Sequence, residues 1–461
     1  MDVLLDAFAA IDRILWSPWT MLFIAGVAVY FTVRSRFFQL TRFPYVLRNT
    51  FGQIFDQPDD LGTQRITPFQ ATATSLAGTV GMGNMAGVAT ALSVGGPGAI
   101  FWMWVLAFFG MMSKTAEISL AVHFREVEAD GRIRGGPMHY IEKGLGWRFL
   151  ALLFSAGIVV NSLFSASLLQ SHTVGRALLS SYDFNPYIVT GLMALVTAAV
   201  VLGGVRRIGR FSEQLVPLMS VVYILAGIAI VVLNVDQIPE VVGMIIQYAF
   251  APVPAAGGMA GVAVAEAIKQ GMARGMLSNE AGLGTAPMVH AAAQTDHPFQ
   301  QGLWGAFEVF IDTIVICSIT AFAILSTGVV SGDASGIELL ITAFAAVFPS
   351  SVAEAVVSAC ILSFCLSTQI GFFVYYETAI HALFGPRAIA YLKWVYFIPG
   401  VLFAGVANVD QLWVVANISV GVTALPNLVA ILMLSGVFFK LMSDYLSGTR
   451  AYDTALTDAE R

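Results

Sequence analysis

Charged side chains are scarce in this chain of 461 residues. Asp, Glu, Lys and Arg make up 11% of the sequence and hydrophobic residues 57%, whereas roughly a quarter of the residues in a soluble domain are charged. The segments between the apolar runs are short, and none has the length of a soluble domain. The composition therefore excludes an ordinary soluble protein and indicates a polytopic membrane protein.

Cysteine is rare, and the sequence motifs of common enzymes are missing. Cys317, Cys360 and Cys365 all fall inside apolar runs, which argues against a disulfide framework or a thiolate metal site. Neither Gly-x-Ser-x-Gly nor His-Glu-x-x-His occurs, and the one Ser-Lys-Thr run lacks the preceding glycine of a phosphate-binding loop. We therefore expect no enzyme. The start of the chain also lacks the basic region of a signal peptide, so the first apolar run is expected to be a retained helix.

Long apolar runs, by contrast, are abundant. About eleven are long enough to cross a bilayer of roughly 30 Å as helices. They lie at about 17–37, 68–93, 98–123, 149–179, 186–204, 212–234, 245–272, 302–328, 351–384, 388–407 and 410–440. A shorter apolar segment, 341–348, is expected to form an external helix over the mouth of a binding site.

Basic and acidic residues alternate between successive loops. Lys and Arg concentrate in every second loop, and the loops between carry Asp and Glu, with Arg13 and Arg176 as the exceptions. Because Lys and Arg in short loops stay cytoplasmic, we expect a protein of the plasma (inner) membrane. Its N-terminus is expected outside and its C-terminus in the cytoplasm.

Glycine-rich stretches interrupt two of the apolar runs, at 77–87 and at 255–263. Glycines so closely spaced weaken a helix, and a broken helix is tolerated in a membrane only where its freed backbone groups face protein, water or a ligand. Each interruption opens a group of five spans, which predicts two inverted repeats whose broken helices meet at mid-depth. The expected division is 1–67 as an N-terminal helix and linker, 68–235 and 240–443 as the repeats, and 444–461 as a tail.

Three motifs carry a resemblance to a known family. They are Gly83–Ala91 running into Gly95–Trp104, then Gly135-Gly136-Pro137-Met138, and then Arg274–Pro287 with the letters RGMLSNEAGLGTAP. With these motifs the chain resembles the alanine or glycine:cation symporters of the amino acid, polyamine and cation superfamily. The resemblance implies an all-α membrane protein of the leucine-transporter-type fold, with an extra N-terminal helix before a 5+5 inverted repeat that contains two broken helices.

The resemblance also implies a sodium site and a substrate site. Sodium, the coupling ion, would bind the backbone carbonyls of Ala77 and Val80 and the hydroxyls of Ser367 and Thr368. Hard oxygen ligands suit this ion, although such hydroxyls also commonly bond back to their own helix. The substrate, a small neutral amino acid, would contact Thr79, Gly81, Met82, Gly83, Asn84, Gln170, Met259, Ala260 and Gly261. Its carboxylate would lie at the N-terminus of the half-helix that starts near Gly81.

Two positions in this implied site depart from the family pattern. Met82 stands where a small hydroxyl residue is expected, and Ala260 stands near an expected aromatic residue. We therefore expect a reshaped pocket, which leaves the identity of the amino acid open.

Ionisable residues inside the expected spans are further candidates. Asp312, near mid-depth, is expected either to hold a second cation or a proton or to support a broken helix. Glu308, one turn earlier, shares both interpretations. Lys114 and Glu117, at i and i+3, are expected to form an ion pair.

The function these features favour is sodium-coupled symport of a small neutral amino acid by alternating access. Two alternatives stay open. The run Thr79–Gly83 also looks like a potassium-channel filter, and a carrier could couple to protons in place of sodium.

Overall fold

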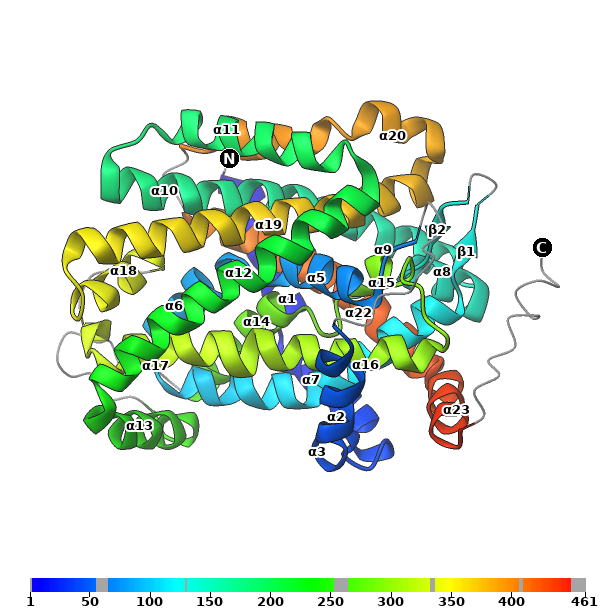
Figure 1. Cartoon of the computed structure of the whole chain (residues 1–461), viewed down its shortest axis with the longest axis horizontal. Helices are drawn as coiled ribbons and strands as arrows, with labels where there is room; N and C mark the ends of the chain where they lie inside the picture. Colours follow the sequence, from blue (N-terminus) through cyan, green and yellow to red (C-terminus); the bar gives the residue numbers. More distant parts are fainter. Residues whose placement is uncertain are drawn as a thin grey trace.

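The computed structural model describes residues 2–54, 65–128, 131–252, 264–331, 336–405 and 409–448. These residues form a helical bundle in which most long helices run along or at a tilt to the long axis of the molecule (Figure 1). Within this part of the chain the strands are two short ones, β1 Glu126–Val127 and β2 Ile133–Arg134, which pair as an antiparallel hairpin. The hairpin marks one end of the bundle, here named the hairpin end. The helix α18 (Ile337–Ala345) marks the other, the α18 end.

The N-terminal region wraps the outside of the bundle. It comprises α1 Asp2–Leu15, α2 Pro18–Arg34, α3 Phe38–Thr41, α4 Phe43–Asn49 and the short 3₁₀ helix η1 Phe51–Gln53. Ser17 and Pro18 begin α2 as cap and first-turn residue, close to the expected start of the first span. Buried Phe31 on α2 stacks on Phe439 near the C-terminus, which ties this helix to the rest of the bundle.

The next group of helices contains the first break. Thr67 and Gln70 form a capping box that starts α5, and the chain then continues past the break to α12. The elements are α5 Pro68–Thr79, η2 Gly83–Gly87, α6 Val88–Gly95, α7 Gly98–His123, α8 Pro137–His139, η3 Tyr140–Gly144, α9 Arg148–Asn161, η4 Ser162–Leu169, α10 Gln170–Tyr182, α11 Pro186–Val201 and α12 Gly204–Leu233. Of these, η2, η3 and η4 are π-helical.

The remaining helices form the second group. They are η5 Val235–Gln237, α13 Ile238–Phe250, α14 Val264–Asn279, α15 Ala286–His290, α16 Pro298–Val309, the π-helical η6 Phe310–Cys317, α17 Ser318–Ser326, η7 Val329–Ser331, α18, α19 Ser350–Phe384, α20 Pro386–Leu392, η8 Val395–Phe397, α21 Ile398–Leu402, α22 Val409–Met433 and α23 Ser435–Leu446. The second predicted interruption, 255–263, lies outside the described residues.

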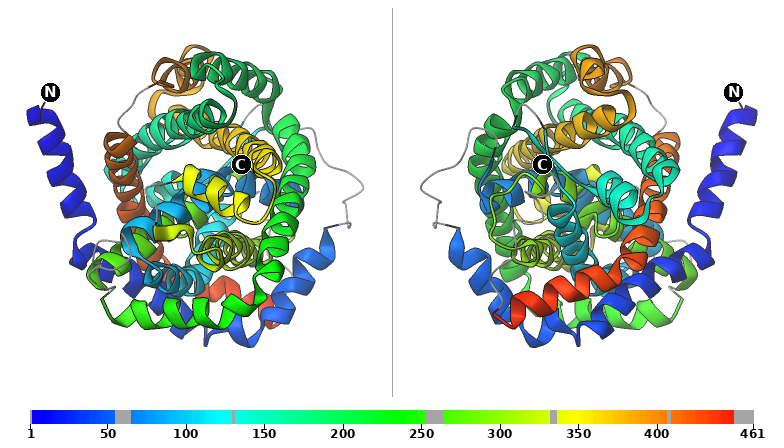
Figure 2. Two further views of the ribbon diagram at one scale, coloured as in Figure 1. Left: turned by 90° about the vertical axis from the view of Figure 1, so that its left-hand side faces the viewer. Right: turned by 90° about the vertical axis from the view of Figure 1, so that its right-hand side faces the viewer.

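Besides the interrupted span 68–93, three expected spans do not form single helices. The segment 245–272 joins the end of α13 to α14, and α13 lies across the bundle at the α18 end (Figure 2). The segment 388–407 divides into α20, η8 and α21, because prolines at 386 and 399 start new short helices. The segment 410–440 ends its long helix at Met433, and α23 turns away to lie across the hairpin end.

Six helices in the described part of the chain are long and apolar enough to cross a membrane. They are 98–123, 148–182, 204–233, 298–326, 350–384 and 414–433, and α2 and α11 are shorter apolar helices. The outward faces are apolar too: Leu218, Leu225 and Val232 on α12 are all more than 60% exposed, as expected for side chains that face lipid. The chain is thus an all-helical integral membrane protein, whereas the total of eleven spans stays a prediction.

The broken helix lies at the centre of this bundle. Every residue of α5 from Gln70 to Thr79 is buried, and α5 contacts α12, α15, α16 and α19. The short helix α18, which overlaps the expected segment 341–348, packs against η2, α17 and α19. The fold therefore surrounds the first break on all sides with helices from both groups.

Candidate functional site

The first break lies where the glycine pattern predicted it. The helix α5 ends at Thr79, and Val80 adopts an extended backbone with φ −75° and ψ 94°. The amide N–H of Gly81 then donates to Asn84 Oδ1 at 2.9 Å, which caps the π-helical segment η2. Both backbone and side chains here are buried, so the break exposes peptide groups to the protein interior and not to lipid.

Two of the four expected sodium ligands face each other across this break. The Thr368 hydroxyl on α19 lies 3.4 Å from the Val80 carbonyl oxygen. The two helices approach closely because Gly371 faces Gly78, where an added Cβ would lie 2.7 Å from the Gly78 nitrogen. The hydroxyls of Ser367 and Thr368 also donate to the Phe364 carbonyl, at 2.8 and 3.0 Å. The local helix bonds that compete with ion binding are therefore formed.

A small cavity adjoins the break. Its volume is about 20 Å³, enough for about one water molecule. The lining residues are Gly78, Thr79, Met82, Gly83, Asn161, Ser165, Gln170, Leu277, Glu280, Leu283 and Phe372. An amino acid does not fit this volume, so the arrangement is a closed one that has to widen before it can hold such a substrate.

Four residues expected at the substrate site line this cavity, namely Thr79, Met82, Gly83 and Gln170. Gln170 also fixes the break, because its Oε1 accepts from the Met82 amide at 3.2 Å. Gly81 does not line the cavity: a Cβ there would lie 2.4 Å from the Thr368 hydroxyl, so this position has no room for a side chain.

The other expected substrate residues lie elsewhere. Asn84 points away from the cavity toward Asp312, whose Oδ1 accepts from the Asn84 amide at 2.7 Å. Met259, Ala260 and Gly261 lie outside the described residues.

Asp312 connects three elements beside the break. Besides the bond from Asn84 on η2, its Oδ2 accepts from Ser278 on α14 and from Thr313 on η6, each at 2.8 Å. Asp312 is 1% exposed, and burying a carboxylate is costly unless it accepts such bonds. The sequence singled out Asp312 but not Ser278, which stands in the Arg274–Pro287 motif.

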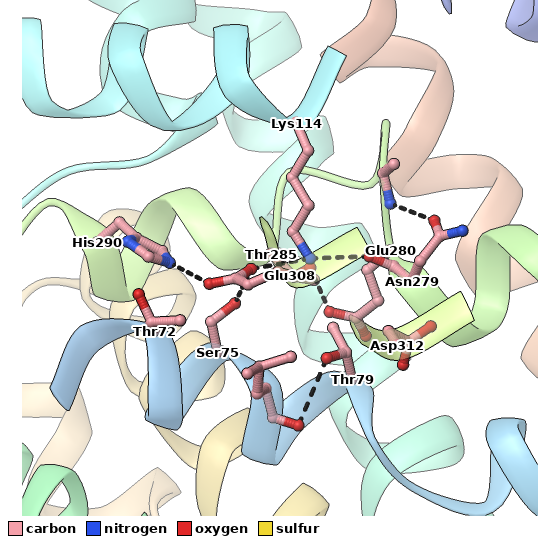
Figure 3. A network of polar contacts seen from close by, with 12 residues as sticks. Thr72, Ser75, Thr79, Lys114, Asn279, Glu280, Thr285, His290, Glu308 and Asp312 are labelled. Carbon is pink, nitrogen blue, oxygen red and sulfur yellow. Dashed lines mark hydrogen bonds and ion pairs between the residues drawn. The ribbon is translucent and has the colours of Figure 1, made fainter. Parts of the chain in front are cut away.

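A buried ionic cluster lies beside α5 (Figure 3). The Lys114 ammonium on α7 is 3.1 Å from Glu308 Oε2 on α16 and donates to the Asn279 carbonyl at 2.8 Å. Glu308 also accepts from the Ser75 hydroxyl on α5 at 2.8 Å and lies 2.6 Å from His290 Nε2. The side chains of Lys114, Glu308 and His290 are completely buried. Through the Glu308 carboxylate, the broken helix α5 is thus connected to Lys114 on α7 and to His290 on α15.

The bonds at His290 define its tautomer. The Gln301 amide nitrogen lies 2.8 Å from Nδ1, and an amide NH₂ can only donate. Nδ1 therefore accepts, and Nε2 carries the hydrogen that bonds Glu308.

In place of the expected ion pair with each other, Lys114 and Glu117 each bond a residue on another helix. Lys114 pairs with Glu308, and Glu117 instead accepts from the Asn427 amide at 2.9 Å. The reason is the close packing of α7 and α16, where a Cβ on Gly302 would lie 2.2 Å from the Ser119 hydroxyl and one on Gly305 would lie 3.0 Å from the Lys114 backbone.

Glu280 is the cavity residue that sequence reasoning missed. It follows α14 directly and has a left-handed backbone with φ 55°, a conformation uncommon outside glycine. Its carboxylate accepts a hydrogen bond of 2.5 Å from Thr285 and lines the cavity. The signal was present in the Arg274–Pro287 motif, in which Glu280 is an acidic residue inside a largely apolar stretch.

The whole chain is similar to proteins of known family. A model of the sodium:alanine symporter family matches residues 1–458. The chain is 37% identical to the sodium/alanine symporter AgcS of Methanococcus maripaludis, over 93% of this chain and 94% of AgcS. It is also 37% identical to the uncharacterized transporter YflA of Bacillus subtilis, over 98% of this chain and 96% of YflA.

A solved structure supports the same assignment at the level of the fold. The crystal structure of MhsT in complex with L-phenylalanine superposes with a TM-score of 0.59, at 15% identity, over 81% of this chain and 90% of MhsT. The fold is thus of the leucine-transporter type, and the protein is a transporter and not an enzyme. Together, the broken central helix and the match along the full length show that this chain belongs to the sodium:alanine symporter family.

Proposed function

We propose that this protein is a sodium-coupled symporter that carries a small neutral amino acid, similar to alanine or glycine, by alternating access. One observation carries the proposal: the Val80 carbonyl faces the Thr368 hydroxyl at 3.4 Å, and a buried cavity adjoins the same break. Cation and substrate would then bind to adjacent backbone groups of one broken helix. Binding of either would strengthen binding of the other to the same extent.

The proposed sodium ligands are the carbonyls of Ala77 and Val80 and the hydroxyls of Ser367 and Thr368. All four ligands are neutral oxygens, which suit a hard monovalent cation without trapping it. Ion binding would require Thr368 to exchange its bond to the Phe364 carbonyl for the ion. Such an exchange costs little, because the hydroxyl already lies between the two carbonyls.

The proposed substrate groups are Thr79, Met82, Gly83 and Gln170, with Gly81 and Asn84 shaping the break and 259–261 contributing from the second interruption. The amide N–H groups of η2 suit a substrate carboxylate. Met82 fills part of the cavity wall, and its sulfur accepts a bond from Thr173. This side chain favours a small amino acid over a bulky one.

Alternating access would be provided by the two groups of helices, 68–235 and 240–443, moving as inverted repeats. Near the start of the second group, α13 lies across the bundle at the α18 end, and α23 at the end of that group lies across the hairpin end (Figure 2). In the plasma membrane we propose that the hairpin end faces the cytoplasm, since the basic loops expected there include Arg125, Arg132 and Arg134.

The channel alternative is disfavoured by the course of the chain. A potassium-channel filter lies on a re-entrant loop, whose two flanks return to one side. In Figure 1, α6 continues from α5 toward the α18 end, so the residues of Thr79–Gly83 lie within one interrupted span. A proton in place of sodium remains a competing proposal, which the following experiment separates.

The test is uptake by purified protein in liposomes. A panel of labelled neutral amino acids would be measured with an inward sodium gradient, with an inward proton gradient, and with neither. We expect saturable uptake of alanine or glycine that requires sodium and increases with an inside-negative potential, which contributes about 2.3 kcal/mol per 100 mV for each positive charge carried. Uptake driven equally by protons without sodium would contradict the sodium site, and non-saturable cation flux would support a channel.

A further inference from the structure

Glu280 is the charged residue in the lining of the cavity, and the transport site proposed above assigns it no role. The other polar lining side chains, Thr79, Asn161, Ser165 and Gln170, are neutral. Asp312 and Glu308 are bonded to neighbouring side chains and do not line it. A positively charged group that enters the cavity would therefore meet one carboxylate.

The backbone holds this carboxylate in place. Glu280 has φ 55°, a strained conformation at a residue other than glycine and one that accumulates at functional sites. The preceding residue, Asn279, is fixed on both sides, because its carbonyl accepts from Lys114 and its side-chain oxygen accepts from the Ala281 amide. The turn after α14 thus directs Glu280 and not a neighbour toward the cavity.

Charge compensation around Glu280 is incomplete. Its hydrogen bond comes from Thr285, a neutral group, and Lys114 is already paired with Glu308 at 3.1 Å. Figure 3 shows both carboxylates beside the one ammonium. A buried carboxylate is expensive unless a cation compensates it, so the cavity attracts a positive group on its Glu280 side.

The broken helix contributes a complementary group to the cavity. Gly83 begins η2 and lines the cavity, and helix N-termini favour negative groups. A cavity lined by both a helix N-terminus and a carboxylate matches a zwitterion. The sodium site proposed at Val80 and Thr368 consists of neutral groups.

We propose that Glu280 receives the α-ammonium group of the substrate and thereby selects amino acids over their 2-hydroxy and deaminated analogues. This inference rests on the proposed function, because it assumes that the cavity is the amino-acid site. It assigns the ammonium to a side chain of the Arg274–Pro287 motif. Substrates with a second carboxylate near the amine would be disfavoured by repulsion.

The experiment compares the full-length wild type with Glu280→Gln in liposomes. Sodium-driven uptake of labelled L-alanine would be inhibited by unlabelled L-alanine and, separately, by L-lactate, which carries a hydroxyl in place of the ammonium. A hydrogen bond between charged groups contributes about 1.5–3 kcal/mol, so E280Q is expected to bind alanine about 10- to 100-fold more weakly. The affinity for lactate is expected to change little, so that the discrimination between the two compounds falls by the same factor.

Glu266→Gln is the matched control, because Glu266 is an acid on α14 that bonds Gln270 and does not line the cavity. Its discrimination is expected to equal that of the wild type. Glu280→Asp keeps the charge on a shorter side chain and is expected to retain more discrimination than E280Q. Sodium binding without amino acid, measured by titration calorimetry, should survive in every variant and shows that each is folded.

The outcomes separate the inference from the function on which it rests. If the wild type shows no sodium-driven uptake of any neutral amino acid, the proposed function fails. If the wild type transports but E280Q discriminates alanine from lactate as well as the wild type does, the ammonium assignment is wrong. An E280Q variant whose sodium binding is weakened while discrimination is unchanged would overturn it too, since Glu280 would then be a sodium ligand.

Discussion

The two sides of the first broken helix are built from different chemistry. On the side that faces α19, named here the hydroxyl side, Val80 meets Thr368 through neutral oxygens. On the side that faces α7 and α16, named here the ionic side, Ser75 meets Lys114 and Glu308 through charged groups. The stretch of chain from Ser75 to Val80 therefore contacts two very different polar environments.

This difference indicates which contacts exchange and which persist. Neutral oxygens bind a monovalent cation weakly enough to release it, whereas an ion pair removed from water has no substitute partner once it is separated. We therefore infer that the hydroxyl side is remade in each transport cycle, and that the pair between Lys114 and Glu308 stays closed. On the ionic side, the contact made by Ser75 is weaker than the pair between Lys114 and Glu308, because Ser75 bonds Glu308 through a neutral hydroxyl.

The largest effect is expected from breaking the ionic side. Lys114→Met leaves the Glu308 carboxylate buried without its cation, which costs about 3–5 kcal/mol, and thermal unfolding in detergent should show a strongly lowered midpoint. The double variant K114M/E308L replaces the pair with apolar side chains and should recover much of this loss. Lys143→Met is the control, since its pair with Glu126 is largely exposed and worth about 0–1 kcal/mol. A double variant no more stable than K114M would show that the loss of the ion pair does not cause the lowered midpoint of K114M.

A smaller effect is expected at Asp312, which lies between the two sides. Asp312→Asn replaces an acceptor for Asn84, Ser278 and Thr313 with a group that has one acceptor oxygen, at a cost of about 2 kcal/mol. We expect reduced thermal stability with an unchanged number of charges carried per amino acid. A lower charge-to-substrate ratio, measured by current and tracer flux together, would instead assign a second cation or a proton to Asp312.

The hydroxyl side is expected to control sodium binding while contributing little to the stability of the fold. Thr368→Ala removes one proposed ligand, so the sodium concentration for half-maximal uptake should rise about tenfold, the equivalent of 1.4 kcal/mol, while the midpoint of thermal unfolding changes little. Ser363→Ala, on the same helix and bonded to the Ala359 carbonyl, should leave sodium activation as in the wild type. Unchanged activation in T368A would falsify the ligand assignment.

The smallest effect concerns charged groups outside the spans, beside the hairpin. Burial lowers the pKa of His139 to about 4, so His139 is neutral at pH 7. An unfolded histidine protonates below a pKa of about 6.5. Stability from the folded state is therefore complete above pH 6.5 and is lost as the pH falls toward 4, by about 1 kcal/mol at pH 5.5.

Hydrogen exchange of the hairpin measures this loss directly. Exchange should accelerate between pH 7 and 5.5 after correction for the intrinsic rate, and His139→Asn should remove the acceleration. Slower exchange at pH 5.5 would mean that protonated His139 gains more from Glu126, at 3.8 Å, than it loses through burial. That result would weaken the comparison between the two sides of the break, because a charged group would then be as favourable beside the hairpin as on the ionic side.

The local features of this fold were readable from the sequence. Closely spaced glycines predicted the break at 77–87, and hydroxyl residues on a later span predicted the contact between Thr368 and Val80. Both inferences depend on backbone chemistry and on a family resemblance that covers the whole chain.

The partners of buried charges were not readable in the same way. The spacing of Lys114 and Glu117 describes neighbours on one helix, but tertiary packing decides which helix lies opposite. Gly302 and Gly305, three residues apart on α16, mark the face that approaches α7. Only the assembled structure shows that Glu308, one turn further on, lies against Lys114. Likewise, the left-handed backbone that directs Glu280 toward the cavity occurs at a residue other than glycine, so no glycine in the sequence marks this conformation.

The π-helical segments around the cavity impose a length requirement on the chain. Between Ser162 and Leu169, η4 winds more residues into each turn than an α-helix does, and Gln170 follows directly. If the same residues were wound as an ordinary α-helix, every later side chain on α10 would be rotated about the helix axis from its present position. Gln170 would then face away from the Met82 amide. Such a segment tolerates the replacement of its side chains far better than a change in their number.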